Sequence, residues 1–194
     1  MPKSKASEKA AETESVPDTE VAVLPKLSDR QNAVASVSNL EQLRAYIGAP
    51  IDWQQIEPSF EVRPQSDFEG VPLIIGGFRF NDSSKFMSPD PVEPKVMIPA
   101  RFVSMLVAAY DEASGEFVSP WVIVNDGSTG IRQQLTRMIT RQTGENAELY
   151  SREQLNMIAN TVPPIDASKG FRKSEYAKEL ADGSVAEATT WYIA

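Results

Sequence analysis

The chain has 194 residues, of which 41% are apolar, and a formal net charge of −8 at pH 7. It contains no cysteine and no histidine, which excludes disulfide bonds, Cys/His zinc sites, a thiol nucleophile and a histidine general base. No apolar run approaches the roughly 18 residues of a membrane-spanning helix. The first residues also lack the apolar segment of a signal peptide, so we expect a cytoplasmic protein with no membrane partner.

Composition divides the chain into three parts. The first is rich in Lys, Glu, Ser and Ala with few large apolar residues, which is typical of a disordered arm. A short helix and linker follow, because Ser38 and Glu41 form a capping-box pattern before an apolar stripe. Trp53 and Ile56 are expected to anchor this segment. We therefore expect an arm at 1–34, a helix (39–47) and linker at 35–56, and one folded domain at 57–194.

The domain begins with strand patterns. Residues 60–62 alternate over a short run, and residues 71–80 form the strongest strand pattern in the chain. The pair Gly76-Gly77 inside that strand predicts a sharp bend or bulge. Four prolines among polar residues then predict a long loop at 81–99.

The next segment favours a hairpin. Residues 101–109 fit either a strand or a buried helix, but turn residues at 111–115 separate them from a β-branched and aromatic run at 116–124. Such a partner strand across a turn favours the strand interpretation. The sequence NDGSTG at 125–130 then ends the strand.

A basic helix is predicted after this break. Its apolar residues follow the i, i+4, i+7, i+8 spacing of one helical face. Ser128 or Thr129 can cap its start, and Gly144 can end it. No acidic residue lies between Ser128 and Thr143, the longest acid-free basic stretch of the chain, which includes Arg132, Arg137 and Arg141. The polar loop before it could cradle a phosphate or could be only a tight turn, which we consider the more frequent case.

The last part combines a helix and a hairpin. Ser151 and Gln154 fit a capping box for a helix within 147–161, inside an inserted loop and helix at 146–167. Two strands at 170–178 and 186–193 follow, with a turn between them, although residues 174–181 also fit a helix. The chain is thus mainly β with short helices (α+β). Its order of elements favours an OB-like small barrel with a helix between strands 3 and 4 and a disordered N-terminal arm.

Clustered cations and rings indicate single-stranded nucleic-acid binding, in which bases stack on aromatic rings and Lys or Arg neutralises phosphates. Phe78, Phe80, Trp121 or Tyr176 would stack bases, and Arg132, Arg137, Arg172 and Lys173 would contact phosphates. At each position the alternative is a ring that fills the core or a cation on an ordinary solvated face. The candidate binding residues are Phe78, Arg79, Phe80, Trp121, Arg132, Arg137, Arg141, Arg172, Lys173 and Tyr176.

Catalysis has little support in the sequence. The acidic pairs Asp67 with Glu69 and Asp111 with Glu112 show no pattern that would bring them into a common cleft. We expect a protein that is not an enzyme and has no cofactor. Two alternatives remain open: a structural or protein-interaction module without affinity for DNA, and a metal-assisted enzyme acting on nucleic acids.

Several segments are similar to a known group. They are GVPLI at 70–74, FRFN at 78–81, GEFVS at 115–119, NDGSTGI at 125–131, GFRKSEY at 170–176 and TTWYI at 189–193. The pattern resembles small actinobacteriophage proteins usually described as single-stranded DNA-binding proteins. This resemblance implies an OB-like barrel that binds single-stranded DNA and acts in phage DNA replication or recombination. Replication or recombination proteins and further copies of the chain are the other expected partners. The segments at 81–99 and 146–167 depart from the pattern.

Overall fold

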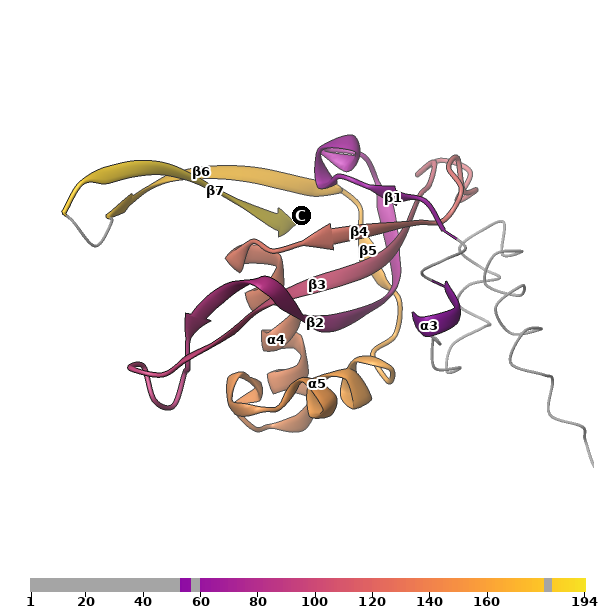
Figure 1. Cartoon of the computed structure of the whole chain (residues 1–194). Coiled ribbons are helices and arrows are strands. Elements are labelled where there is room, and N and C mark those ends of the chain that lie inside the picture. The colour runs from indigo at the N-terminus through magenta and orange to yellow at the C-terminus, as the bar shows by residue number, and fades with distance from the viewer. Residues whose placement is uncertain (1–52, 57–59, 180–182) are drawn as a thin grey trace, which may run out of the picture.

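The computed structural model describes residues 53–56, 60–179 and 183–194 (Figure 1). The expected arm at 1–34, the helix at 39–47 and the packing of the Ile56 side chain lie outside the described part. The strands are β1 (Val62–Arg63), β2 (Leu73–Pro89), β3 (Met97–Ala109), β4 (Val122–Asp126), β5 (Ile165–Ala167), β6 (Phe171–Glu179) and β7 (Val185–Ile193). The helices are α3 (Trp53–Ile56), α4 (Thr129–Thr143) and α5 (Arg152–Ala159), with 3-10 turns η1 (Gln65–Phe68) and η2 (Ala147–Leu149).

The fold is mainly β, as predicted, and is built around a curled five-stranded sheet. The strand order is β1-β4-β3-β2-β5, in which β2, β3 and β4 form an antiparallel meander and β1 runs parallel to β4. Strands β6 and β7 form a separate two-stranded sheet. Figure 1 shows α4 and α5 on one face of the curled sheet and the β6–β7 hairpin extending away from it.

The predicted bend in β2 is present. The pairing of β2 with β3 shifts register between Ile75 and Gly77, which is the signature of a bulge. A Cβ atom on Gly76 would lie 2.9 Å from Cζ3 of Trp121, so a glycine is required where this indole crosses the strand. The glycine pair therefore bends the strand and makes room for a ring on the neighbouring segment.

The long loop predicted at 81–99 is wrong. Strand β2 continues to Pro89 and β3 starts at Met97, so only residues 90–96 connect them. Asp90 closes this connection, because its Oδ1 accepts hydrogen bonds from the N–H groups of Val92 (2.7 Å) and Glu93 (3.0 Å). The ends of β2 and β3 that lead into this connection pair only with each other, and we call them the β2–β3 arm. Prolines are tolerated in this two-stranded arm because a backbone N–H that faces outward has no neighbouring strand to bond to.

Residues 101–109 form a strand rather than a helix, and the predicted hairpin is present. Its turn is closed by Asp111, whose carbonyl oxygen accepts a hydrogen bond from the N–H of Gly115 at 2.8 Å. The second strand starts later than predicted, at Val122, and extends to Asp126 instead of ending at Val124. The strand reaches Asp126 because residues 125 and 126 pair with Ser104 and Val103 of β3.

Two apolar clusters lie on the two faces of the sheet. The larger contains Phe78, Phe80 and Phe171 and packs between the sheet, α4 and α5. The smaller lies on the other face around Trp53 and Trp121. Trp53 is 6% exposed and lies under the guanidinium of Arg79, 5.3 Å from the ring centroid, so it anchors its segment as predicted.

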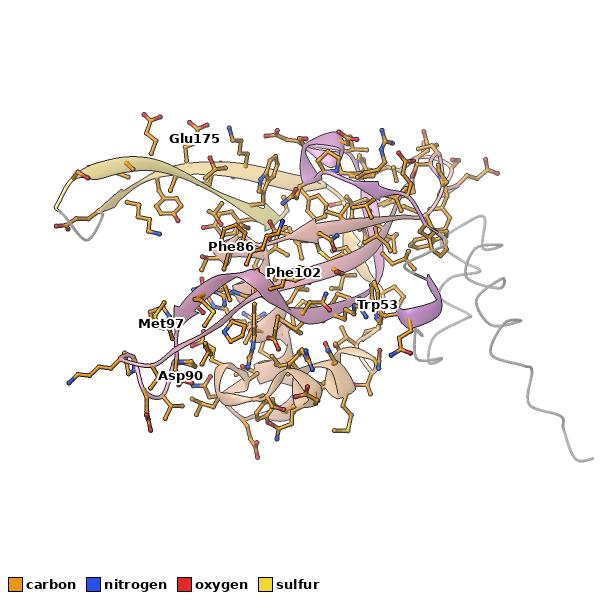
Figure 2. The ribbon with its side chains drawn as sticks, viewed as in Figure 1. Trp53, Phe86, Asp90, Met97, Phe102 and Glu175 are labelled. Atoms are coloured by element: carbon orange, nitrogen blue, oxygen red, sulfur yellow. The ribbon has the colours of Figure 1, made fainter. Side chains whose placement is uncertain are left out.

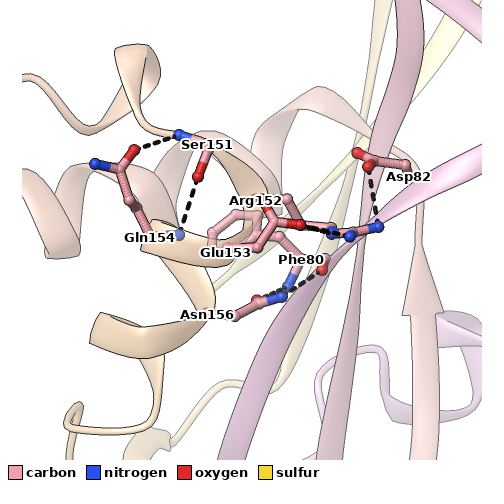
Figure 3. Close-up of polar contacts among 7 residues, drawn as sticks. All are labelled: Phe80, Asp82, Ser151, Arg152, Glu153, Gln154 and Asn156. Carbon is pink, nitrogen blue, oxygen red and sulfur yellow. Dashed lines mark hydrogen bonds and ion pairs between the residues drawn. The ribbon is translucent and has the colours of Figure 1, made fainter.

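Helix α5 attaches to the free edge of β2. Its predicted capping box is present, with both hydrogen bonds between Ser151 and Gln154 (Figure 3). The side-chain amide of Asn156 accepts a hydrogen bond from the N–H of Phe80 (2.7 Å) and donates one to its carbonyl oxygen (2.9 Å). Arg152 also forms an ion pair with Asp82 of β2 at 3.1 Å. The side chain of Asn156 thus replaces a neighbouring strand at this point of the sheet edge.

Candidate nucleic-acid interface

Helix α4 has the predicted bounds, but Ser128 makes a different contact from the one expected of a helix cap. Gly144 is its C-cap in the left-handed conformation, with a φ of 77°. Ser128 occupies the N-cap position without a capping hydrogen bond. Its hydroxyl instead donates to Oδ2 of Asp126 (2.7 Å) and accepts from the N–H of Trp191 on β7 (3.2 Å). The start of α4 is therefore fixed by β7 as well as by its own loop.

Residues 125–130 form the end of β4, a two-residue connection and the start of α4, and the N–H of Gly130 is bonded within the protein rather than free to bind a phosphate. The N–H of Gly130 donates to Oγ1 of Thr190 at 2.8 Å, so a hydroxyl of β7 lies where an anion would bind at the helix N-terminus. A Cβ on Gly130 would lie 2.2 Å from the backbone oxygen of Trp191. The helix backbone and β7 are thus in direct contact.

The outer edge of β7 is held by one glutamine. Oε1 of Gln134 accepts from the N–H of Ile193 (2.7 Å), and its Nε2 donates to the carbonyl oxygen of the same residue (2.9 Å). These bonds supply what a neighbouring strand would otherwise provide. Together with the contacts of Ser128 and Gly130, they orient the whole β6–β7 hairpin relative to α4.

The two faces of this hairpin differ in charge. Residues paired across antiparallel strands share a face, and successive residues alternate between faces. The register pairs Arg172 with Tyr192 and Tyr176 with Ala188. One face therefore holds Arg172, Ser174, Tyr176, Lys178, Ala186, Ala188, Thr190 and Tyr192, which include no acid. The opposite face holds Glu175, Glu179 and Glu187, and in Figure 2 the labelled Glu175 lies on the side of the hairpin away from the curled sheet.

The acid-free face of the hairpin meets α4 at a cavity of about 260 Å³. The cavity is lined by Thr129, Gly130, Gln133, Ser174, Tyr176, Thr190 and Tyr192. A second cavity of about 360 Å³ lies further along α4, lined by Gln134, Arg137, Met138, Arg141, Ile165 and Ile193. None of these lining residues is acidic.

One stripe of α4 connects the two cavities. Gly130, Gln133, Arg137 and Arg141 are spaced three or four residues apart, so they lie on one side of the helix. The first two line the smaller cavity and the last two line the larger. We define the basic track as the exposed cations and rings along this stripe and the acid-free hairpin face. It consists of Arg137, Arg141, Arg172, Tyr176, Lys178 and Tyr192.

Three of the predicted stacking residues are buried. Phe78 and Phe80 are 2% and 0% exposed and pack edge to face in the larger cluster, with ring centroids 5.9 Å apart. Trp121 is 6% exposed and packs against Phe117 in the smaller cluster. Burying such a ring contributes roughly 1.5–3 kcal/mol, about as much as one stacked base. Exposing these rings to bind DNA would therefore bring no net gain.

Three of the predicted cations lie away from the basic track. Arg79 lies over Trp53 on the face of the sheet opposite α4. Arg132 precedes Arg137 by five residues, which places it about 140° away around the helix. Lys173 lies on the acidic face of β6, where an ion pair with Glu175 at 2.8 Å raises the pKa of the lysine. Of the predicted residues, the structure leaves Arg137, Arg141, Arg172 and Tyr176 on the track.

Sequence reasoning missed Tyr192, Lys178 and Gln133. The signal for Lys178 was present, because the alternation of β6 already separates Arg172, Tyr176 and Lys178 from the glutamates. The register with β7, which places Tyr192 beside Arg172, is a tertiary feature. Gln133 has no distinguishing pattern in the sequence.

Two further properties concern the described residues only. Among them, no helix is both long enough and apolar enough to cross a membrane. No group of three or more acidic side chains within this part lies close enough together to hold a metal ion. Comparisons with protein-family models, with curated proteins and with solved structures find no match.

Proposed function

We propose that this protein binds single-stranded DNA along the basic track and does not act on it chemically. The observation that carries the proposal is the separation of charge on the β6–β7 hairpin, where the face toward α4 holds cations and tyrosines and the glutamates lie on the other. In a chain of net charge −8, such a face is a local positive site for a polyanion.

The chemistry of the track suits unpaired strands. Arg137, Arg141, Arg172 and Lys178 form no ion pair among the described residues, so their charges are available to phosphates. Tyr176 and Tyr192 are 44% and 38% exposed. Rings in such positions stack on bases, which a duplex keeps inside its own stack. The combination therefore favours a single strand over a duplex.

The overall fold is also compatible with this proposal. A curled meander followed by a helix is compatible with a small barrel of the OB type, a common platform for single strands. The β6–β7 hairpin would form the outer wall of the binding groove, in place of strands that complete the sheet. From the resemblance of segments such as NDGSTGI at 125–131, we propose that the protein serves DNA replication or recombination, in a phage or its bacterial host.

Binding is expected to weaken steeply with salt. A fluorescently labelled oligothymidine should bind with micromolar or tighter affinity at low salt, and the slope of log K against log[salt] should be about −0.7 for each phosphate neutralised. With the four cations of the track engaged, the slope would be about −3. A salt titration by fluorescence anisotropy measures both quantities. No binding at low salt, or equal binding to a duplex, would argue against the proposal.

The alternative is a protein-interaction module, which the β2–β3 arm favours. The arm exposes large apolar side chains: Phe86, Met87, Val92, Val96 and Met97. A patch of this kind is typical of protein contacts. A stable complex or oligomer that has no affinity for DNA in the same titration would support this alternative instead.

A further inference from the structure

The cavity where the acid-free face of the hairpin meets α4 has the character of a binding pocket for one planar group. Tyr176 and Tyr192 come from different strands, and both line it. Its volume of about 260 Å³ is just below that of pockets for drug-sized ligands, which span roughly 300–1,000 Å³. It is therefore large enough for a group the size of one nucleobase.

The polar groups of this pocket are neutral. Thr129 and Ser174 contribute hydroxyls and Gln133 contributes an amide, while no charged side chain lines the cavity. Gln133 forms no side-chain hydrogen bond among the described residues, so both its donor and its acceptor are available. The lining is thus unsuited to a phosphate and suited to the edge of an uncharged heterocycle.

We propose that this pocket holds one unpaired base of the bound strand, in contact with Tyr176 and Tyr192, and that Gln133 hydrogen-bonds to the edge of that base. A glutamine amide pairs in bidentate fashion with adenine, through an acceptor and an adjacent amino group. The phosphate contacts of the basic track do not depend on the base sequence of the DNA. Any preference for a strand that contains adenine therefore comes from this pocket. The inference rests on the proposed binding of single-stranded DNA.

The test compares two oligonucleotides and three proteins. The oligonucleotides are an oligothymidine of about 12 nucleotides, within the usual site size, and the same oligomer with one central adenine. The wild-type protein should bind the adenine-containing strand more tightly, by between roughly fivefold and a hundredfold. Gln133→Leu should remove this ratio and leave the salt dependence unchanged. Arg137→Gln, the matched control on the same helix stripe, should weaken both strands equally and keep the ratio.

The outcomes separate this inference from the proposed function. Wild-type binding with no preference for the adenine strand, or a preference that Gln133→Leu leaves intact, would overturn the pocket assignment and leave DNA binding standing. A preference for the pure thymidine strand would overturn the adenine assignment. Failure of the wild-type protein to bind either strand would overturn both proposals. Circular dichroism of each variant confirms that a lost ratio does not reflect unfolding.

Discussion

Replacing both Arg137 and Arg172 with glutamine is expected to weaken single-stranded DNA binding roughly 25-fold at about 0.1 M salt. Each lost phosphate contact removes about 0.7 from the slope of log K against log[salt] for a single strand, so the slope should become about 1.4 shallower. The two residues belong to different elements, α4 and β6, and join the track from its two sides. An anisotropy titration at several salt concentrations measures both effects.

The matched control moves each substitution to a neighbouring cation that lies off the track. Arg132→Gln with Lys173→Gln removes the same charge from the same two elements, but on the far side of α4 and on the acidic face of β6. This double variant should retain nearly the wild-type affinity and slope. Equal losses in the two double variants would mean that only net charge matters, and the defined track would then be wrong.

Gly130→Ala is expected to destabilise the protein and to abolish binding, although alanine is the better helix former by about 1 kcal/mol. The new Cβ would lie 2.2 Å from the backbone oxygen of Trp191 and 2.8 Å from Oγ1 of Thr190. A backbone atom cannot rotate away, so β7 must shift and lose its bonds to α4. Overpacking of this kind costs typically 1–3 kcal/mol. Urea unfolding measures the lost free energy, and anisotropy measures the lost affinity.

Gly127→Ala serves as the control in the same loop. A Cβ at Gly127 meets no atom within 4 Å, and the residue is not in the left-handed region. Its stability and affinity should remain close to those of the wild type. If Gly130→Ala instead stabilised the protein by its helix propensity and left binding intact, the contact between α4 and β7 would not be what positions the hairpin.

The parts of the fold that short-range signals specify were predictable from the sequence. Gly144 ends α4, the Ser151–Gln154 box starts α5, and the glycine pair bends β2, because each feature depends on a few adjacent residues. The sequence did not exclude the alternative helix at 174–181. The structure excludes it for the described residues of that range, because β6 continues to Glu179. The prediction for 81–99 was wrong because prolines indicate a loop locally but are tolerated along an exposed two-stranded arm.

The candidate site was only partly predictable, for a different reason. Alternation placed Phe78 and Phe80 opposite Arg79, as the structure has them, but it did not reveal which side of β2 faces the larger apolar cluster. That choice depends on Val103 of β3 and on α4, which cover the phenylalanine side. The positions of Arg132 and Arg137 around the helix were available from the spacing alone. Their relation to the hairpin depends on contacts between residues about 60 positions apart.

We expect one strand of DNA to lie along α4 and the acid-free face of the β6–β7 hairpin. Ultraviolet crosslinking of a bound oligothymidine, followed by mass spectrometry of the crosslinked peptides, tests it most directly. Crosslinks are expected at Tyr176 and Tyr192, the two exposed rings of the track. Crosslinks confined to Phe86 and Phe102, which Figure 2 labels on β2 and β3, would contradict it.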